Sequence, residues 1–138
     1  MNVADPAVLA GLLDRLTAER ADLERLAAVE PDVLLGDVDR LKSVKYGFVV
    51  AIEVCIDVCH HVVARAGLRS PSTYADAFAV LAEAGLLDDG LAATLADMAG
   101  FRNLLVHGYA RVEDRRVVEI LRSRLGDLAA FQRAAALL

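Results

Sequence analysis

The chain has 138 residues, 57% of them hydrophobic but only 5% aromatic, with no tryptophan and three prolines. That is enough chain for one domain with its own core, and the composition favours an all-α bundle over β-sandwiches or barrels, which need many turns. The formal net charge of −5 excludes binding of nucleic acid over a broad basic surface, so any RNA contact must be local. We expect a single domain over residues 1–138.

Five helices are expected from apolar periodicity and capping signals, and short loops between them predict an up-and-down bundle of four or five helices. The first begins at Asp5-Pro6, an N-cap followed by proline. The second is the longest and is buried on most sides, and Gly126 loosens the last. The expected ranges are 5–29, 32–66, 73–84, 88–108 and 113–137.

The N-terminal six residues have neither the basic region nor the apolar core of a signal peptide. The longest apolar run, residues 48–63, is interrupted by two carboxylates and two histidines and is too short to span a bilayer. We therefore expect a soluble cytoplasmic protein with no membrane partner.

Cys55 and Cys59 stand one helical turn apart in the most apolar region, which is typical of small core residues. With His60 or His61 they form an incomplete zinc set, because a closed site needs a second ligand pair that the sequence lacks. We expect neither a metal site nor a disulfide here.

Candidate catalytic residues lie near the end of the fourth expected helix, where Arg102, Asn103 and His107 occur within six positions. Residues four apart are separated by about 40° around a helix axis, so Asn103 and His107 share a face. Arg102 lies to one side, but its long side chain can reach a phosphate held near the imidazole. The three residues can therefore act on one anion.

Such a set suits metal-free RNA cleavage, in which the ribose 2′-hydroxyl attacks the adjacent phosphorus and leaves a cyclic phosphate. Histidine can accept and donate protons near neutral pH, and arginine offers a permanently charged fork to phosphate oxygens. The alternative is purely structural. Arg102 is then a surface charge and His107 a cation stabilised by the dipole at the helix C-terminus.

Polar residues on the second helix could support this site. Glu53, Asp57 and His61 are spaced by four and form a stripe that includes His60. Arg102 lies on an otherwise apolar ridge of its helix, where a charge needs a partner. We predict that Glu53 or Asp57 contacts Arg102 or His107. The alternative is that the stripe is a solvent-facing edge.

The spacing of Arg102, His107 and Tyr109 is shared with a known family, whose motif is Arg, four residues, His, one residue, Tyr. The first intervening residue is usually polar, and here it is Asn103. Residues 51–61 resemble the family's second long helix and residues 71–78 the start of its next one. The chain from about residue 51 to residue 121 therefore resembles the HepT-like group of the HEPN superfamily. The chain departs from the family pattern in its richer valine content and in the adjacent histidines His60 and His61.

This resemblance implies an HEPN-like bundle that forms a two-fold homodimer around the motif helix. It also implies the toxin of a type II-like toxin–antitoxin pair, a metal-independent endoribonuclease that needs no cofactor and acts on RNA, not DNA. His107 is then the general acid/base, Arg102 the phosphate clamp and Asn103 an orienting group. Loss of a positioned acid/base typically costs about 10²–10⁴-fold in rate, so His107→Ala is expected to nearly abolish cleavage.

For Tyr109 the resemblance implies a separate role. The family's partner is a minimal nucleotidyltransferase (MNT) antitoxin that transfers AMP to the tyrosine of the motif, and the added negative charge would silence the site. Two alternatives stay open on the residues alone. One is a non-catalytic subunit that binds a nucleotide or substrate for the nucleotidyltransferase, with Arg102 as an anion anchor, and the other is a structural dimer with a vestigial motif.

Overall fold

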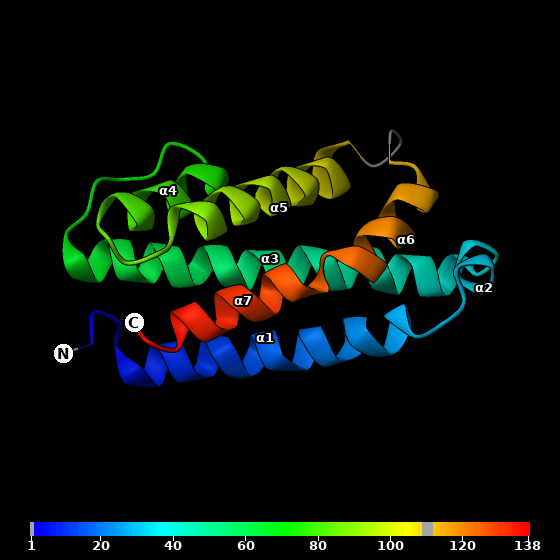
Figure 1. The fold of residues 1–138 in the computed structure, drawn as a ribbon, viewed down its shortest axis with the longest axis horizontal. Coiled ribbons are helices and arrows are strands. Elements are labelled where there is room, and N and C mark those ends of the chain that lie inside the picture. The colour runs from blue at the N-terminus through cyan, green and yellow to red at the C-terminus, as the bar shows by residue number, and fades with distance from the viewer. Residues whose placement is uncertain (1, 109–111) are drawn as a thin grey trace.

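The computed structural model describes residues 2–108 and 112–138, and within these ranges the chain is all-α, as predicted (Figure 1). Among the described residues there are seven helices in place of the five expected, because two of the expected helices are each interrupted once. Their bounds are α1 Pro6–Ala27, α2 Pro31–Leu35, α3 Val38–Ala66, α4 Tyr74–Glu83, α5 Asp89–His107, α6 Asp114–Ser123 and α7 Leu125–Ala135.

The second expected helix is wrong as a single element. Gly36 closes the short α2, and Asp37 then adopts an extended backbone and accepts a hydrogen bond from the backbone N–H of Arg40. A side chain that caps a new first turn satisfies otherwise unpaired N–H groups, so the break costs little.

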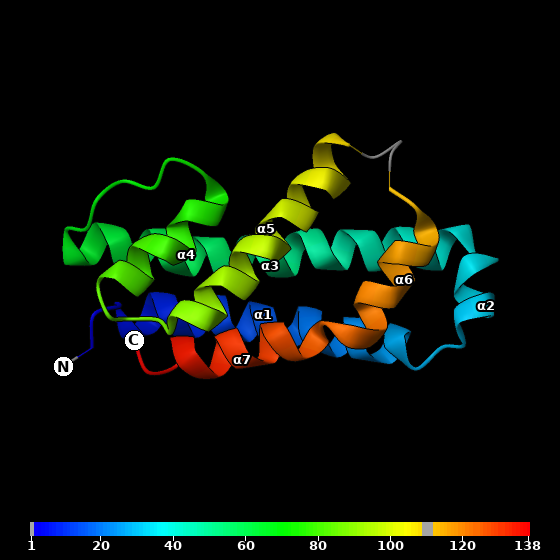
Figure 2. The same ribbon diagram turned by 45° about the horizontal axis from the view of Figure 1, so that its top comes forward.

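The last expected helix is also divided, at Arg124 and not at Gly126. Arg124 has φ −117° and ψ 3°, outside helical geometry, although its N–H still reaches the carbonyl of Ile120. Its guanidinium also bonds the carboxylate of Asp127 in the first turn of α7. The bend lets α6 and α7 follow different directions across the bundle (Figure 2).

Helix α3 is the central element of the fold. Figures 1 and 2 show α1 running antiparallel along one side of α3, with α4 and α5 on another side and α7 crossing beside α1. The chain ends meet at one end of the bundle, where the N–H of Ala4 donates to the carbonyl of Leu138 at 3.0 Å. The motif helix α5 therefore packs directly on the central helix.

The length and composition of α3 would suffice to cross a membrane, but 67% of its most apolar window is buried inside the bundle. Phe48, Ile52 and Val44 of this helix are fully buried, together with Phe78 from α4 and Phe131 from α7. Helix α3 is thus the core helix of a bundle, and its burial explains its apolar sequence.

The helices that carry the candidate site begin at the predicted caps. Thr73 accepts a hydrogen bond from the N–H of Asp76 at the start of α4, and Asp88 accepts one from the N–H of Leu91 at the start of α5. Gly85 has φ +73°, the left-handed conformation that glycine adopts without steric cost after a helix. The Asp88 cap fixes the first residue of α5, and the regular helix that follows sets which way the side chains of its last turn point.

Candidate active site

Arg102 lies on the face of α5 that packs against α3, with only 11% of its side chain exposed. The prediction that it occupies a core-facing ridge is confirmed, since Leu95, Met98 and Leu105 on the same ridge are buried. A charge this enclosed requires partners, because burial without them is costly.

The predicted carboxylate contact to Arg102 is present, and its partner is Glu53. One carboxylate oxygen of Glu53, Oε1, accepts from both Nε and Nη2 of Arg102, at 3.1 and 2.7 Å. Nη1 of Arg102 donates to Oδ1 of Asn103 at 3.0 Å, and the guanidinium carbon lies 5.0 Å from the centroid of the Tyr74 ring. Charge-assisted bonds and a cation–π contact therefore fix the orientation of the guanidinium.

Three of the five guanidinium N–H groups are used in these bonds. The other N–H groups of Nη1 and Nη2 remain to bind an anion. Asn103, whose amide oxygen faces Arg102, thus helps to orient the guanidinium, while its own amide NH₂ is a further donor.

His107 and Arg102 border one cavity of about 470 Å³, which we call the motif cavity. Helix α5 supplies three of its residues, helices α3 and α4 one each, and the segment that leads into α4 the remaining three. Its lining residues are His60, Pro71, Ser72, Thr73, Tyr74, Arg102, Asn103 and His107. All three residues predicted to be catalytic are therefore brought together. His107 is exposed at the last position of α5, where the dipole stabilises a cation.

A smaller cavity of about 260 Å³ adjoins it, sharing His60 and Tyr74 and adding Glu53, Ile56 and Asp57. Partial burial raises the pKa of the Asp57 carboxyl, the positive charge of His60 opposes this, and the Glu53 carboxylate adds to it. Asp57 is exposed and reaches the rim of the site, but Glu53 is the carboxylate bonded to Arg102. Glu53 and Asp57 thus both belong to the site region.

The expectation that His61 supports the site is wrong. Nε2 of His61 accepts a hydrogen bond from the backbone N–H of Asp5 at 2.9 Å, which ties it to the N-terminal segment. Two successive four-residue steps from Glu53 rotate the side chain by about 80°, and this drift carries His61 away from α5. The neighbouring His60 lines both cavities instead.

The wall made by residues 71–73 is held by a cluster of three charged side chains. Arg69 forms paired bonds of 2.7 and 2.9 Å to Asp76 and of 2.8 Å each to Glu83. Oδ2 of Asp76 also accepts from the backbone N–H of Ser72 at 2.9 Å. The Asp76 carboxylate therefore bonds the residue just before Thr73, the N-cap of α4. The loop is thereby tied to α4.

We expect Arg69→Gln to reduce stability at neutral pH and to matter progressively less in acid. The Arg69 guanidinium holds the pKa values of Asp76 and Glu83 below their ordinary values of 3.8 and 4.5. Carboxylates with a depressed folded-state pKa stabilise the protein fully above those ordinary values, begin to lose that contribution below them, and lose it completely only below the depressed folded-state pKa. Chemical denaturation should show a smaller stability difference between the two proteins at pH 3 than at pH 7, and an equal difference at both pH values would contradict this origin.

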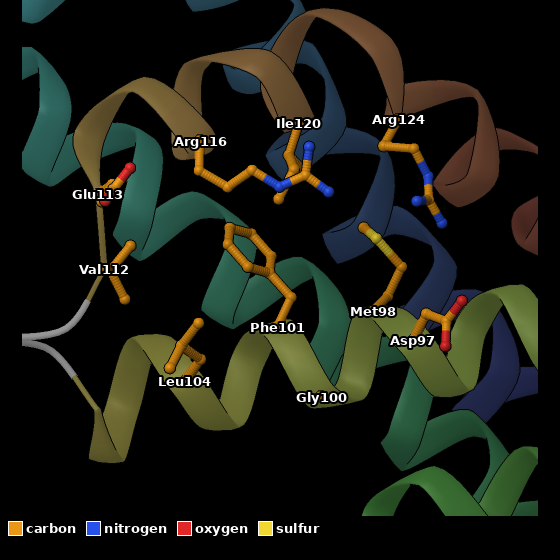
Figure 3. A pocket seen from close by; sticks show the side chains of 10 residues that line it. All are labelled: Asp97, Met98, Gly100, Phe101, Leu104, Val112, Glu113, Arg116, Ile120 and Arg124. Atoms are coloured by element: carbon orange, nitrogen blue, oxygen red, sulfur yellow. The ribbon is translucent and has the colours of Figure 1, made fainter.

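A different cleft opens on the other side of α5, with a volume of about 530 Å³. Figure 3 shows Phe101 and Leu104 of α5 pointing into it toward Arg116 and Ile120 of α6. Arg116 is already paired with Glu119 at 3.1 Å, and no histidine lines the cleft. Its size alone does not make it the candidate site, because acid–base chemistry needs groups that titrate near working pH.

The two cysteines are buried core residues. Desolvation raises the pKa of both Cys55 and Cys59, which disfavours the thiolate form that binds metals. Among residues 2–108 and 112–138 no cluster of three or more His, Cys, Asp and Glu side chains is placed to hold a metal ion.

Tyr109, the expected modification site, lies outside the described residues. The wall residues Pro71, Ser72, Thr73 and Tyr74 were not predicted as site residues from the sequence. Tyr74 is an exposed aromatic residue in the first turn of α4, and Pro71 begins the wall segment. Only their position in a proline- and serine-rich loop before a helix hinted at a surface role.

Comparison with known proteins shows which family the chain resembles. The family model described as "Ribonuclease HepT-like" matches residues 17–135. The mRNA nuclease HepT of Shewanella oneidensis is 33% identical over 79 residues, which are 57% of this chain and 59% of that protein. The chain thus matches less than two thirds of the length of this relative.

Solved structures with the same fold include a tri-AMPylated HEPN toxin of Shewanella oneidensis in complex with an MNT antitoxin. It has a TM-score of 0.86 and 23% identity, and the match covers 97% of each chain. YutE of Bacillus subtilis, a cytosolic protein of unknown function, gives 0.83 at 14% identity over 99% of this chain and 91% of its own. With the family match spanning most of its length, the chain belongs to the HepT-like ribonuclease family.

Proposed function

We propose that this protein is a metal-independent endoribonuclease, the toxin of an HEPN/MNT toxin–antitoxin pair in the cytoplasm. The observation that carries the proposal is the motif cavity, in which the His107 imidazole and the Arg102 guanidinium border one space. Family membership and the 33% identity to an mRNA nuclease support the same activity.

Each residue has a chemical task in this proposal. The scissile phosphate binds the free N–H groups of Arg102, which stabilise the charge that builds on the phosphorane oxygens. Asn103 holds one edge of the guanidinium and Glu53 the other. His107 transfers a proton during attack of the 2′-hydroxyl, which the substrate supplies, so only RNA can react. The products are a 2′,3′-cyclic phosphate and a 5′-hydroxyl.

The acidic protein can still bind RNA because the cation is local and preoriented. The formal charge of −5 repels a polyanion at long range, so association is expected to be slow at low salt. A homodimer around α5 would place two motif cavities near each other. Exposed Leu104 and Val106, each 42% exposed beside the motif, are apolar residues that such an interface would cover.

Control by the partner completes the proposal. A neighbour of the same fold is a tri-AMPylated toxin in complex with an MNT antitoxin. We place the equivalent modification at Tyr109, two residues beyond His107. AMP attached two residues along the chain from His107 would add negative charge and oppose binding of the substrate phosphate.

The proposal is tested with purified protein whose intact mass shows no added AMP. It is incubated in excess EDTA with a labelled single-stranded RNA, and with the same oligonucleotide carrying 2′-deoxyribose at the mapped cut site. We expect cleavage of the RNA to a 2′,3′-cyclic phosphate and none at the deoxy position. Absence of cleavage, or linear 3′-phosphate or 3′-hydroxyl as the primary product, contradicts the proposed function.

A further inference from the structure

Two residues line both the motif cavity and the smaller cavity beside it, namely His60 and Tyr74. Tyr74 contacts Arg102 as well, since the guanidinium carbon lies over its ring at 5.0 Å from the centroid. Arg102 lines the motif cavity and not the smaller one. The Tyr74 ring therefore forms part of the boundary between the two cavities and rests against the cation of one of them.

The two cavities differ in the charge of their walls. Arg102, Asn103 and His107 give the motif cavity hydrogen-bond donors and a permanent positive charge. The smaller cavity has the carboxylates of Glu53 and Asp57, and neither of these residues lines the motif cavity. A phosphate and a carboxylate are both anions, so they compete for the same N–H groups of a guanidinium.

Asp57 is the carboxylate that is placed to compete. Glu53 is already committed, because its Oε1 accepts from Nε and Nη2 of Arg102. Asp57 follows Glu53 by one helical turn on α3, where residues four apart are neighbours. It is exposed, and no hydrogen bond within residues 2–108 and 112–138 engages its carboxylate. Such a carboxylate would bind the free N–H groups of Arg102 if nothing stood between them.

We propose that Tyr74 is a positioning residue of this site, whose ring holds the Arg102 guanidinium toward the motif cavity and separates it from the carboxylate of Asp57. The free N–H groups of Arg102 then remain available to the substrate phosphate. This inference rests on the proposed function for the identity of that anion as RNA. Tyr74 touches no reacting atom and acts through Arg102.

The ring is held in place by the way in which α4 begins. Tyr74 is the first residue of α4, and the N-cap Thr73 before it accepts from the N–H of Asp76 at 3.0 Å. The Asp76 carboxylate in turn bonds Ser72 and Arg69. These contacts fix the backbone on both sides of Tyr74 without using its side chain. Substitutions of Tyr74 should therefore leave the start of α4 intact.

Single substitutions test whether the ring is needed. Tyr74→Ala removes it and should lower kcat/KM for RNA cleavage about 10–100-fold, because even a small displacement of a binding group is costly. Tyr74→Phe keeps the ring that contacts Arg102 and should retain most of the rate. Tyr46→Ala is the matched control, since this tyrosine is 66% exposed elsewhere on α3 and lines neither cavity. It should cleave like wild type, and thermal melting checks that all three variants are folded.

A second substitution separates the proposed role from a merely structural one. Asp57→Asn keeps the shape of the side chain and removes its negative charge. In the Tyr74→Ala background it should recover a large part of the lost rate, because the competing anion is gone. In the wild-type background, where the ring already separates Asp57 from Arg102, its effect should be smaller. Equal effects in the two backgrounds, or no recovery, would overturn the role of Tyr74.

Binding is measured apart from cleavage with an RNA that cannot be cut. The probe is a fluorescent oligonucleotide with 2′-O-methyl ribose throughout, which has no 2′-hydroxyl to attack, and its Kd is measured by anisotropy in EDTA. Tyr74→Ala should raise the Kd about tenfold, the scale of one hydrogen bond to a charged group. The double variant of Tyr74→Ala with Asp57→Asn should lower it again.

The two readouts tell failure of this inference from failure of the proposed function. If wild type cleaves RNA and Tyr74→Ala matches it in rate and in Kd, Tyr74 has no positioning role and the ribonuclease remains. If wild type binds the probe but does not cleave, the proposed function fails, and the Kd values of the single and double variants decide the role of Tyr74. If wild type neither binds nor cleaves RNA, both are overturned.

Discussion

Arg102→Ala is expected to lower RNA cleavage about 10²–10³-fold, the usual cost of removing a preorganised donor from a developing oxyanion. The effect should fall on kcat as well as on KM, because the interaction strengthens as charge builds in the transition state. Arg102→Lys should not restore the rate. An ammonium cannot contact Glu53, Asn103 and a phosphate in the planar arrangement that the guanidinium has.

Stability provides a second readout for the same residue. The Glu53 side chain is already 42% exposed beside Arg102, so water can hydrate its carboxylate in Arg102→Ala, and the loss of stability should be small. The reverse change, Glu53→Ala, leaves a guanidinium that is 11% exposed without its carboxylate, and should destabilise more. Urea denaturation of both variants measures this asymmetry.

Arg25→Ala is the matched control for the loss of an arginine. Its side chain is 71% exposed on α1 and pairs with Asp22 one turn away. Neither activity nor stability should change appreciably, because exposed ion pairs contribute little. A rate for Arg102→Ala equal to that of Arg25→Ala would remove Arg102 from the mechanism.

The sequence was sufficient for the parts of this site that lie on one helix. Arg102, Asn103 and His107 are close in the chain, so helical geometry alone placed them near one another. The Glu53 contact could also be predicted, because a charge on an apolar ridge must have a partner and few carboxylates were available. Helix caps at Thr73 and Asp88 were equally visible as local signals.

The predictions that were wrong depended on how side chains rotate around a long helix and on how separate helices pack together. Glu53 and His61 are eight residues apart, and drift along a long helix decides which neighbour each one faces. Helical periodicity does not say that α1, rather than α5, lies beside His61. The breaks at Asp37 and Arg124 likewise arise where the chain must change direction to pack on α3, which residue preferences alone do not encode. The Tyr74 contact with Arg102 joins separate elements in the same way.

The packing of α5 on α3 also supports the last prediction, that Phe48→Ala lowers the free energy of unfolding by about 3–5 kcal/mol. Phe48 is fully buried on α3, and its ring meets Phe101 of α5 edge to face, with centroids 5.3 Å apart and planes at 80°. Phe101 directly precedes Arg102, so this aromatic pair fixes the height and rotation of the motif on the central helix. Urea denaturation measures the loss directly.

Phe101→Ala and the double variant separate the aromatic contact from burial in general. Phe101 is only partly buried and lines the cleft between α5 and α6, so its truncation should destabilise the protein less than that of Phe48. A double-mutant cycle should give a coupling energy of about 0.5–1.5 kcal/mol for the pair. Additive losses would mean that Phe48 stabilises the core without holding α5. With coupling present, Phe101→Ala should also slow cleavage although it touches no substrate, because a displaced α5 moves Arg102 relative to Glu53.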